Sequence, residues 1–218
     1  MQRFRDRRQA GRQLAQKLTR HAGHPDVIVL ALPRGGVPVA YEVALALRVP
    51  LDVFIVRKLG LPGQDELAFG AIASGGIRIL NKDVIDFMRV GQATIDQVTE
   101  REAAELQRRE QRYREGQPSP EVRDRTVILV DDGLATGASM LAAVHGLRTQ
   151  HPKTILVAVP AAAPEAVHLL RQEVDEVVYV LSPKPFEGVG KWYENFKQTT
   201  DEEVQLLLRD AWDQNRGN

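Results

Sequence analysis

The sequence predicts an α/β fold in which helices cover both faces of a Rossmann-like parallel sheet. Short apolar, β-branched runs such as VIVLAL (27–32) and TVILVDD (126–132) alternate with helical segments. Strands that are buried on both faces read as continuous apolar runs. Unusual loops follow three such strands, at 33–36, 57–60 and 131–139. Because parallel strands end on one edge of the sheet, where open α/β folds bind ligands, these loops should converge there.

The first half of the chain supplies a helix, two strands with a helix between them, and a hairpin. An apolar stripe at helical spacing predicts a helix over 6–20. The strand 27–32 ends at Pro-Arg-Gly-Gly and leads into a helix over 37–47, and LDVFIVRK (51–58) reads as the next strand. AFGAIASGGIRIL (68–80) predicts two short strands around a Ser-Gly-Gly turn.

The second half begins with a charged region, 82–115, whose apolar residues are spaced as on long helices. QPSPE (117–121) ends these helices. Strand and helix then alternate to the C-terminus. The expected elements are a strand at 126–132, a helix at 138–149, a strand at 154–160, a helix opening at Pro164, a strand at 176–182 and a helix near 201–213.

Length and composition narrow the class of protein. A chain of 218 residues suits one domain, 1–218, with a helical insertion at about 82–117. Lys and Arg total 29 and Asp and Glu total 29, so no global basic field favours a nucleic-acid partner. The chain has no cysteine, and no apolar run approaches the length of a membrane span. We therefore expect a cytoplasmic protein with no membrane partner.

The stretch VILVDDGLATGAS (127–139) carries the chemistry. After the strand, Gly133 to Ser139 form a turn of small residues that exposes backbone N–H groups at a helix N-terminus, which suits a phosphate. No Gly-Lys-Ser/Thr follows, so this is not a Walker A loop. Asp131 and Asp132 would repel a phosphate, but they suit vicinal hydroxyls or the water shell of Mg²⁺. The alternative, a helix cap with close packing, needs only one aspartate.

These residues carry a family resemblance. VILVDDGLATGAS resembles the phosphoribosyl-pyrophosphate motif of the type I phosphoribosyltransferases over its whole length and at unbroken spacing. LPRGGVPVA (32–40) is similar to the pyrophosphate loop of that fold, and RKLGLPG (57–63) to the basic strand end of adenine-type enzymes. End to end, the chain resembles stand-alone bacterial phosphoribosyltransferase-like proteins. The resemblance leaves open whether the chain forms a homo-oligomer.

The resemblance implies a role for each matching residue. Asp131 and Asp132 would hold the ribose hydroxyls, partly through water-bound Mg²⁺, and phosphoribosyl pyrophosphate and a small nitrogen acceptor would be the ligands. Arg34 and Arg57 would join the aspartates in catalysis, and the bond between Pro33 and Arg34 is the candidate for a cis peptide. The 5-phosphate would be held by Ala135, Thr136, Gly137, Ala138 and Ser139, and pyrophosphate by Arg34, Gly35, Gly36 and Lys58.

The acceptor is less well specified. Enzymes for 6-oxopurines usually carry an aspartate where this chain has Ala135, whereas adenine- and uracil-type enzymes often have alanine. The hood that covers the base would be residues 183–196, where Phe186, Trp192 and Tyr193 offer rings for a base to stack on. The alternative for these rings is a hydrophobic plug, and the alternative for Lys58 is an ordinary surface residue.

Three functions are compatible with these motifs. The first is transfer of phosphoribose to a nitrogen acceptor, with a nucleobase favoured. The second is a regulatory protein that binds phosphoribosyl pyrophosphate without turnover, although the balanced charge and the lack of a DNA-binding motif disfavour it. The third is a dinucleotide-binding enzyme, which the missing G-x-G-x-x-G after the first strand strongly disfavours.

Overall fold

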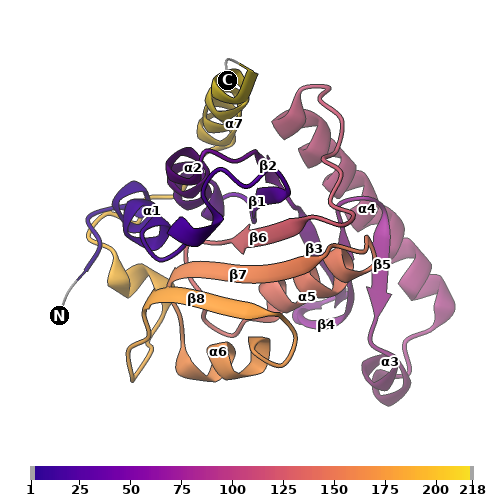
Figure 1. Cartoon of the computed structure of the whole chain (residues 1–218). Helices are drawn as coiled ribbons and strands as arrows, with labels where there is room; N and C mark the ends of the chain where they lie inside the picture. Colours follow the sequence, from indigo (N-terminus) through magenta and orange to yellow (C-terminus); the bar gives the residue numbers. More distant parts are fainter. Residues whose placement is uncertain (1–2, 217–218) are drawn as a thin grey trace.

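The computed structural model describes residues 3–216, apart from the side chains of residues 64–66 and 215–216. Its centre is a parallel five-stranded sheet (Figure 1), which confirms the predicted class. The register joins Val27 to Thr126 and Ala31 to Val130 across the two central strands. The strand order is β2 (Leu51–Val53), β1 (Val27–Ala31), β6 (Thr126–Val130), β7 (Thr154–Ala161) and β8 (Glu176–Leu181).

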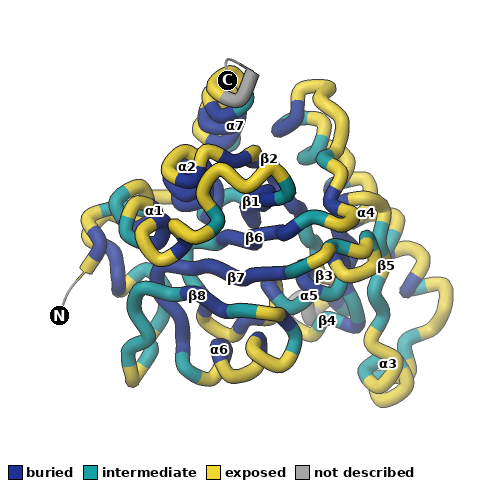
Figure 2. Tube along the Cα trace, in the orientation of Figure 1, coloured by how far each residue is buried: buried dark blue, intermediate teal, exposed yellow. Residues whose placement is uncertain are grey.

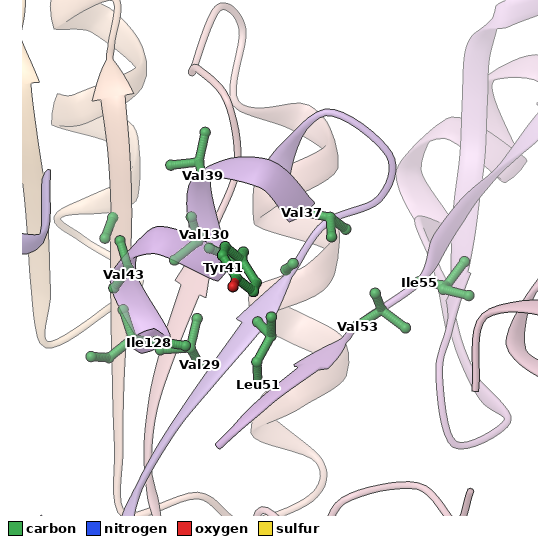
Figure 3. Close-up of a cluster of buried hydrophobic side chains, with 14 of the residues drawn as sticks. Val29, Val37, Val39, Tyr41, Val43, Leu51, Val53, Ile55, Ile128 and Val130 are labelled. Carbon is green, nitrogen blue, oxygen red and sulfur yellow. The ribbon is translucent and has the colours of Figure 1, made fainter. Parts of the chain in front are cut away.

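Helices cover both faces of this sheet, and alternate strand residues reach each face. Val29 and Val130 pack on one side against α2, as Figure 3 shows, whereas Leu30 and Leu129 belong to the core on the other side. The two central strands, β1 and β6, are accordingly buried along their length (Figure 2). The first face meets α1 (Arg7–Ala15), α2 (Gly36–Leu47) and α7 (Asp201–Arg216), and the second meets α5 (Ala138–Arg148) and α6 (Pro164–Leu170).

A second, antiparallel sheet stands beside the first one, and it corrects one prediction. The run 51–58 is not a single strand, because β2 ends at Val53 and the chain enters the second sheet at Val56. The two strands predicted around Ser-Gly-Gly are confirmed, since Gly75 and Gly76 turn the chain with φ of 87° and 74°. The sheet comprises β3 (Val56–Leu61), β4 (Gln64–Ala73) and β5 (Ile77–Leu80).

The charged region forms two helices, as predicted. α3 (Lys82–Met88) ends at Arg89 in the left-handed conformation, and α4 (Gln92–Arg114) runs alongside β3 and α7. The tail contains a short 3-10 helix, η2 (Val189–Trp192), before α7. Within the described residues, no helix is both long and apolar enough to cross a membrane.

The predicted N-terminal helix over 6–20 is shorter than expected. α1 stops at Ala15, and a 3-10 helix, η1 (Thr19–His21), follows it. Asp6 caps α1 by accepting a hydrogen bond from the Gln9 backbone N–H at 2.8 Å. Such caps satisfy an amide that the first helical turn leaves without a partner.

Candidate active site

The candidate site lies where the strand order reverses. β1 is followed by a crossover to β2 on one side, whereas β6 continues the sheet on the other side (Figure 1). Open α/β sheets bind ligands at such a switch point, outside the carboxyl ends of the strands. The two loops touch at their start, because the Leu32 backbone N–H donates to the Val130 carbonyl at 2.8 Å. The loop after β1 and the loop after β6 therefore form one surface.

Asp131 and Asp132 lie at the end of β6, as the sequence predicts. The side-chain Oδ1 of Asp131 accepts a hydrogen bond from the backbone N–H of Asp132 at 2.8 Å. Burial, reinforced by the charge of Asp132, raises the pKa of Asp131 well above its usual range. Burial also raises the pKa of Asp132, and the neighbouring Arg7 opposes that shift. Two carboxylates held this close need a cation or hydroxyl donors beside them.

Arg7 of α1 supplies such a cation, and the sequence motifs offered no indication of it. Its Nε and Nη2 both approach Oδ2 of Asp132 at 2.8 Å, and its Nη1 donates to the Lys197 carbonyl at 2.7 Å. The guanidinium also lies 4.0 Å from the centre of the Phe196 ring. The arginine comes from a helix more than a hundred residues upstream of the aspartates, so no local spacing could have linked them.

The predicted phosphate loop runs from Ala135 to Ser139 and opens α5. Gly137 adopts φ of 80°, a conformation that glycine allows without strain. Thr136, Ala135, Ser139 and the neighbouring residues of the loop lie at the edge of the sheet, and Ala135, Thr136, Ala138 and Ser139 are exposed. Thr136 Oγ1 accepts a long hydrogen bond of 3.4 Å from the Ala138 backbone N–H. The first amides of an 11-residue helix thus face the same edge as the aspartates.

Glycines bring the loop after β1 against the two acids. A Cβ on Gly35 would overlap Oδ2 of Asp132, and one on Gly36 would lie 2.7 Å from the Val130 carbonyl oxygen. Backbone atoms leave no room for a side chain at Gly36, and a side chain at Gly35 would displace the Asp132 carboxylate. The Gly-Gly pair therefore reflects a close approach rather than a simple turn. The peptide bond between Pro33 and Arg34 is cis, as predicted.

The two arginines that were predicted to act in catalysis, Arg34 and Arg57, are both engaged with carboxylates of the chain. Arg34 Nη1 lies 3.5 Å from Oδ1 of Asp201, at the start of α7. Arg57 Nε donates to Oε2 of Glu102, a buried residue of α4, at 2.8 Å. Neither carboxylate belongs to a motif recognised in the sequence. The two arginines lie near the loops but are held by α7 and α4.

Lys58 is exposed, as its alternative reading allowed. It also lines a cavity of about 600 Å³ between the second sheet and α5. Ala138 of the phosphate loop lines the same cavity. Lys58 also lines a second hollow together with Arg57 and Glu102, so its side chain lies between the phosphate loop and Arg57.

Two of the three aromatic side chains predicted to stack on a base are buried in the protein rather than exposed to a ligand. Trp192 is 7% exposed and Tyr193 is 3% exposed, and both pack with Phe4 of the N-terminal segment. Phe186 is half-buried and stacks on Trp192 with 6.2 Å between ring centres. The Tyr193 hydroxyl donates to the Asp132 carbonyl at 2.6 Å. This arrangement matches the hydrophobic plug, although the plug holds the N-terminal segment.

The donor set near the acids bears on whether Mg²⁺ fits the site. Among the described residues, no group of three or more His, Asp or Glu side chains could hold a metal ion. Asp131 and Asp132 alone offer two carboxylates, one of them bound to Arg7. Mg²⁺ commonly binds one or two carboxylates together with waters and substrate phosphates. The residues thus fit a magnesium ion that arrives with a polyphosphate ligand.

Comparison with known proteins agrees with this geometry. Residues 3–189 match the family described as "Phosphoribosyl transferase domain". Two Mycobacterium tuberculosis proteins, named "Putative phosphoribosyl transferase MT0597" and "Putative phosphoribosyl transferase Rv0571c", are each 47% identical over 208 residues. The match covers 95% of this chain and 47% of each relative, so the chain spans about half of their length.

A solved structure shows the same fold over nearly the whole chain. The protein TT1426 from Thermus thermophilus is 43% identical, with a TM-score of 0.85. The superposition covers 96% of this chain and 99% of that one. The strand order, the two motif loops and these matches lead to one conclusion. The chain belongs to the phosphoribosyl transferase domain family and has its fold.

Proposed function

We propose that this protein transfers ribose 5-phosphate from phosphoribosyl pyrophosphate to a nitrogen acceptor, with a nucleobase favoured, and releases pyrophosphate. The observation that carries the proposal is the joint edge of β1 and β6. Asp131 and Asp132 lie there between an exposed loop of helix-terminal amides and a loop with no side chains at Gly35 and Gly36. A ribose that carries a phosphate group at each end needs hydrogen-bond acceptors for its hydroxyls and hydrogen-bond donors on both sides for its phosphates.

The reaction breaks the C1–O bond to pyrophosphate and forms a C1–N bond to the acceptor. The electron pair of the broken bond leaves with the pyrophosphate oxygen. Positive charge grows on the ribose ring as the pyrophosphate departs. Asp131 and Asp132 lie where carboxylates would stabilise that charge and fix the ribose hydroxyls. Mg²⁺, when bound with the ligand, would neutralise charge on the departing pyrophosphate. The acceptor nitrogen loses its proton to solvent or to the released pyrophosphate after attack.

Binding of the 5-phosphate falls to the loop from Ala135 to Ser139. Its last amides, at Ala138 and Ser139, belong to the first turn of α5, where the helix dipole favours an anion. Arg34 and Arg57 would serve the pyrophosphate once they leave Asp201 and Glu102. Of the three hood rings expected to stack on the base, Phe186 is the one that is not buried, because Trp192 and Tyr193 are 7% and 3% exposed. We assign the acceptor to the space beside Phe186 and the edge of the hood.

Binding of phosphoribosyl pyrophosphate without turnover is the second candidate. It is favoured by one observation, the engagement of both arginines with carboxylates of the chain. An enzyme must release at least one of these arginines to stabilise the leaving group, whereas a regulatory protein could bind the ribose 5-phosphate end alone.

The deciding experiment measures binding and turnover separately. Phosphoribosyl pyrophosphate with magnesium should raise the melting temperature of the protein by mass action. A panel of nucleobases should then be tested for release of pyrophosphate from labelled phosphoribosyl pyrophosphate. A melting shift with acceptor-dependent release supports the transferase. A shift without release for any acceptor supports the regulatory protein, and no shift at millimolar ligand contradicts both.

A further inference from the structure

Arg7 lies outside every motif of the site, yet its side chain is only 10% exposed. It belongs to α1, which lies beside the tail segment (Figure 1). Backbone hydrogen bonds hold this start of the chain, from Phe4 N–H to the Trp192 carbonyl and from Glu194 N–H to the Phe4 carbonyl, both at 2.8 Å. The hood therefore holds the chain segment just before Arg7, and Asp132 holds the guanidinium of Arg7.

The contacts of Arg7 divide the Asp132 carboxylate into two unlike oxygens. Oδ2 accepts a hydrogen bond from Nε of Arg7, has Nη2 of Arg7 at 2.8 Å, and lies against Gly35. Oδ1 has no hydrogen-bond donor among the described residues, and the side chain is 15% exposed. A guanidinium is a planar fork that stays charged, so it fixes both the position and the rotation of the carboxylate.

Charge gives a second reason for the arginine. Among the described residues, Arg7 makes the one ion pair that either aspartate has. Two adjacent buried carboxylates without a cation would repel the anionic ligand as well as each other. The guanidinium of Arg7 offsets one carboxylate charge before any ligand or metal arrives.

We infer that Arg7 is a positioning residue of the ribose subsite: it holds Oδ2 of Asp132 so that Oδ1 faces a ribose hydroxyl, and it supplies the fixed counter-charge for both aspartates. The inference rests on the proposed function, because it assumes a ribose beside the acids. It makes the N-terminal helix and the hood parts of the ribose subsite, through Phe196 beneath the guanidinium and Tyr193 on the Asp132 carbonyl.

The test compares two probes, ribose 5-phosphate and inorganic phosphate. Inorganic phosphate needs only the loop from Ala135 to Ser139, whereas ribose 5-phosphate also needs the aspartates. In Arg7→Ala, affinity for ribose 5-phosphate should fall roughly ten- to hundredfold, as expected when a charged hydrogen-bond partner is lost. Affinity for inorganic phosphate should stay within about twofold, because the loop makes no contact that Arg7 supports.

Arg8→Ala is the matched control on the same helix. Arg8 Nε pairs with Glu42 at 2.5 Å and makes no contact with the aspartates, so its loss should leave both affinities unchanged. Two further measurements separate positioning from folding, with circular dichroism checking each variant. Arg7→Lys should recover part of the ribose 5-phosphate affinity, and free guanidinium at low millimolar concentration should recover part of it in Arg7→Ala.

The possible failures are distinguishable. A wild-type protein that binds inorganic phosphate but gains nothing from the ribose would contradict the proposed function, and this inference with it. A wild type that binds ribose 5-phosphate more tightly than phosphate, with Arg7→Ala doing the same, would overturn this inference alone. Equal loss of both probes in Arg7→Ala, or no recovery with either lysine or guanidinium, would make Arg7 a residue of the fold only.

Discussion

The acidic and the basic halves of the candidate site are built in different ways. Asp131 and Asp132 are held by backbone, by the glycine loop and by Arg7, all within one closely packed edge. Arg34 and Arg57, by contrast, are held by carboxylates of α7 and α4. Under the proposed function, the acidic half would need no change of partners to hold a ribose, whereas the basic half would exchange partners before it holds pyrophosphate.

Exposure shows the same contrast. The Arg7 and Asp132 side chains are 10% and 15% exposed, whereas Arg34 is 36% exposed. Ion pairs in water are weak because solvent screens them, and their members exchange readily. A ligand phosphate can therefore displace Asp201 from Arg34 at little cost. Arg57 and Glu102 are 26% and 9% exposed, so that pair is less accessible than the pair of Arg34 and Asp201. Under the proposed function, the acidic half is therefore the rigid half, and the basic half is switchable at Arg34.

The largest loss of stability is expected from a substitution at Gly36, in the loop that packs against the two aspartates. In Gly36→Ala the new Cβ would lie 2.7 Å from the Val130 carbonyl oxygen and 2.9 Å from Cα of Asp131, and both are backbone atoms. Neither can move without displacing the strand end, so the free energy of unfolding should fall by about 3 kcal/mol or more. Urea unfolding measures the loss, and ribose 5-phosphate binding should disappear.

Gly91→Ala is the control for that substitution. Gly91 precedes α4 with φ of −68°, and a Cβ there would meet no atom within 4 Å. Its unfolding free energy should change by no more than about 1 kcal/mol. Similar losses for both alanine variants would show that the approach of the glycine loop to the acids is not tight.

A smaller effect, which should differ between the two variants, is expected from amide substitutions at the two aspartates. Asp132→Asn leaves the nearly buried Arg7 guanidinium without its charge partner, so the free energy of unfolding should fall by about 1–3 kcal/mol. Asp131→Asn removes a carboxylate whose pKa is raised by burial and by Asp132, so stability at neutral pH should stay equal or rise. Paired urea titrations at neutral pH check this order. A larger loss in Asp131→Asn would mean that Arg7 is not the partner that matters.

The sequence predicted the parts of the fold and site that local chemistry determines. The apolar runs predicted the parallel strands, and the stretch from Asp131 to Ser139 predicted a loop at the strand edge, because these signals lie within a few residues of each other. Arg7, Asp201 and Glu102 were missed. Each meets its partner across a long separation in sequence, and a single charged residue on a helix reads as solvated until its neighbours are known.

Burial explains the remaining differences. The first six residues of LDVFIVRK are mostly apolar, so nothing in the sequence marks the point between Val53 and Val56 where the chain passes from one sheet to the other. Trp192 and Tyr193 are rings that suit either a base or a core, and composition alone does not distinguish the two. Packing against Phe4, from the far end of the chain, decides their burial in the structure.

Releasing Arg34 from Asp201 tests whether the basic half can exchange its partners. Asp201→Asn removes the carboxylate that Arg34 and Arg112 share, so affinity for pyrophosphate with magnesium should rise by about two- to fivefold, the size of a solvent-exposed ion pair. Glu202→Gln is the control, because Glu202 is 72% exposed and pairs with Arg112 rather than with Arg34. Calorimetric titration measures both variants. An unchanged or weaker affinity in Asp201→Asn would mean that Asp201 does not compete with the ligand.

The same contact has a defined pH dependence. The Tyr113 hydrogen bond, with Arg112 and Arg34 nearby, lowers the pKa of Asp201 below its usual value. A lowered carboxyl pKa adds stability above the unfolded-state value of about 3.9, and that stability is lost as pH falls through the folded-state pKa. Arg34 therefore stays paired throughout the neutral range. The advantage of Asp201→Asn for pyrophosphate should be constant between about pH 6 and 8.

The smallest effect is expected at Trp192, within the plug that braces the acidic half. Its indole Nε1 is buried without a hydrogen-bond partner among the described residues. Trp192→Phe removes that unsatisfied donor, which stabilises, but it also leaves a small void, which destabilises. The two terms are of similar size, so the unfolding free energy should change by no more than about 1 kcal/mol. Acceptor and ribose 5-phosphate binding should both be unchanged, because Tyr193 and Phe196 still hold Asp132 and Arg7. Urea unfolding followed by circular dichroism avoids the fluorescence of Trp212. If Trp192→Phe instead loses acceptor binding while its stability is intact, the indole contacts the base. The hood would then have to change its packing when the acceptor binds.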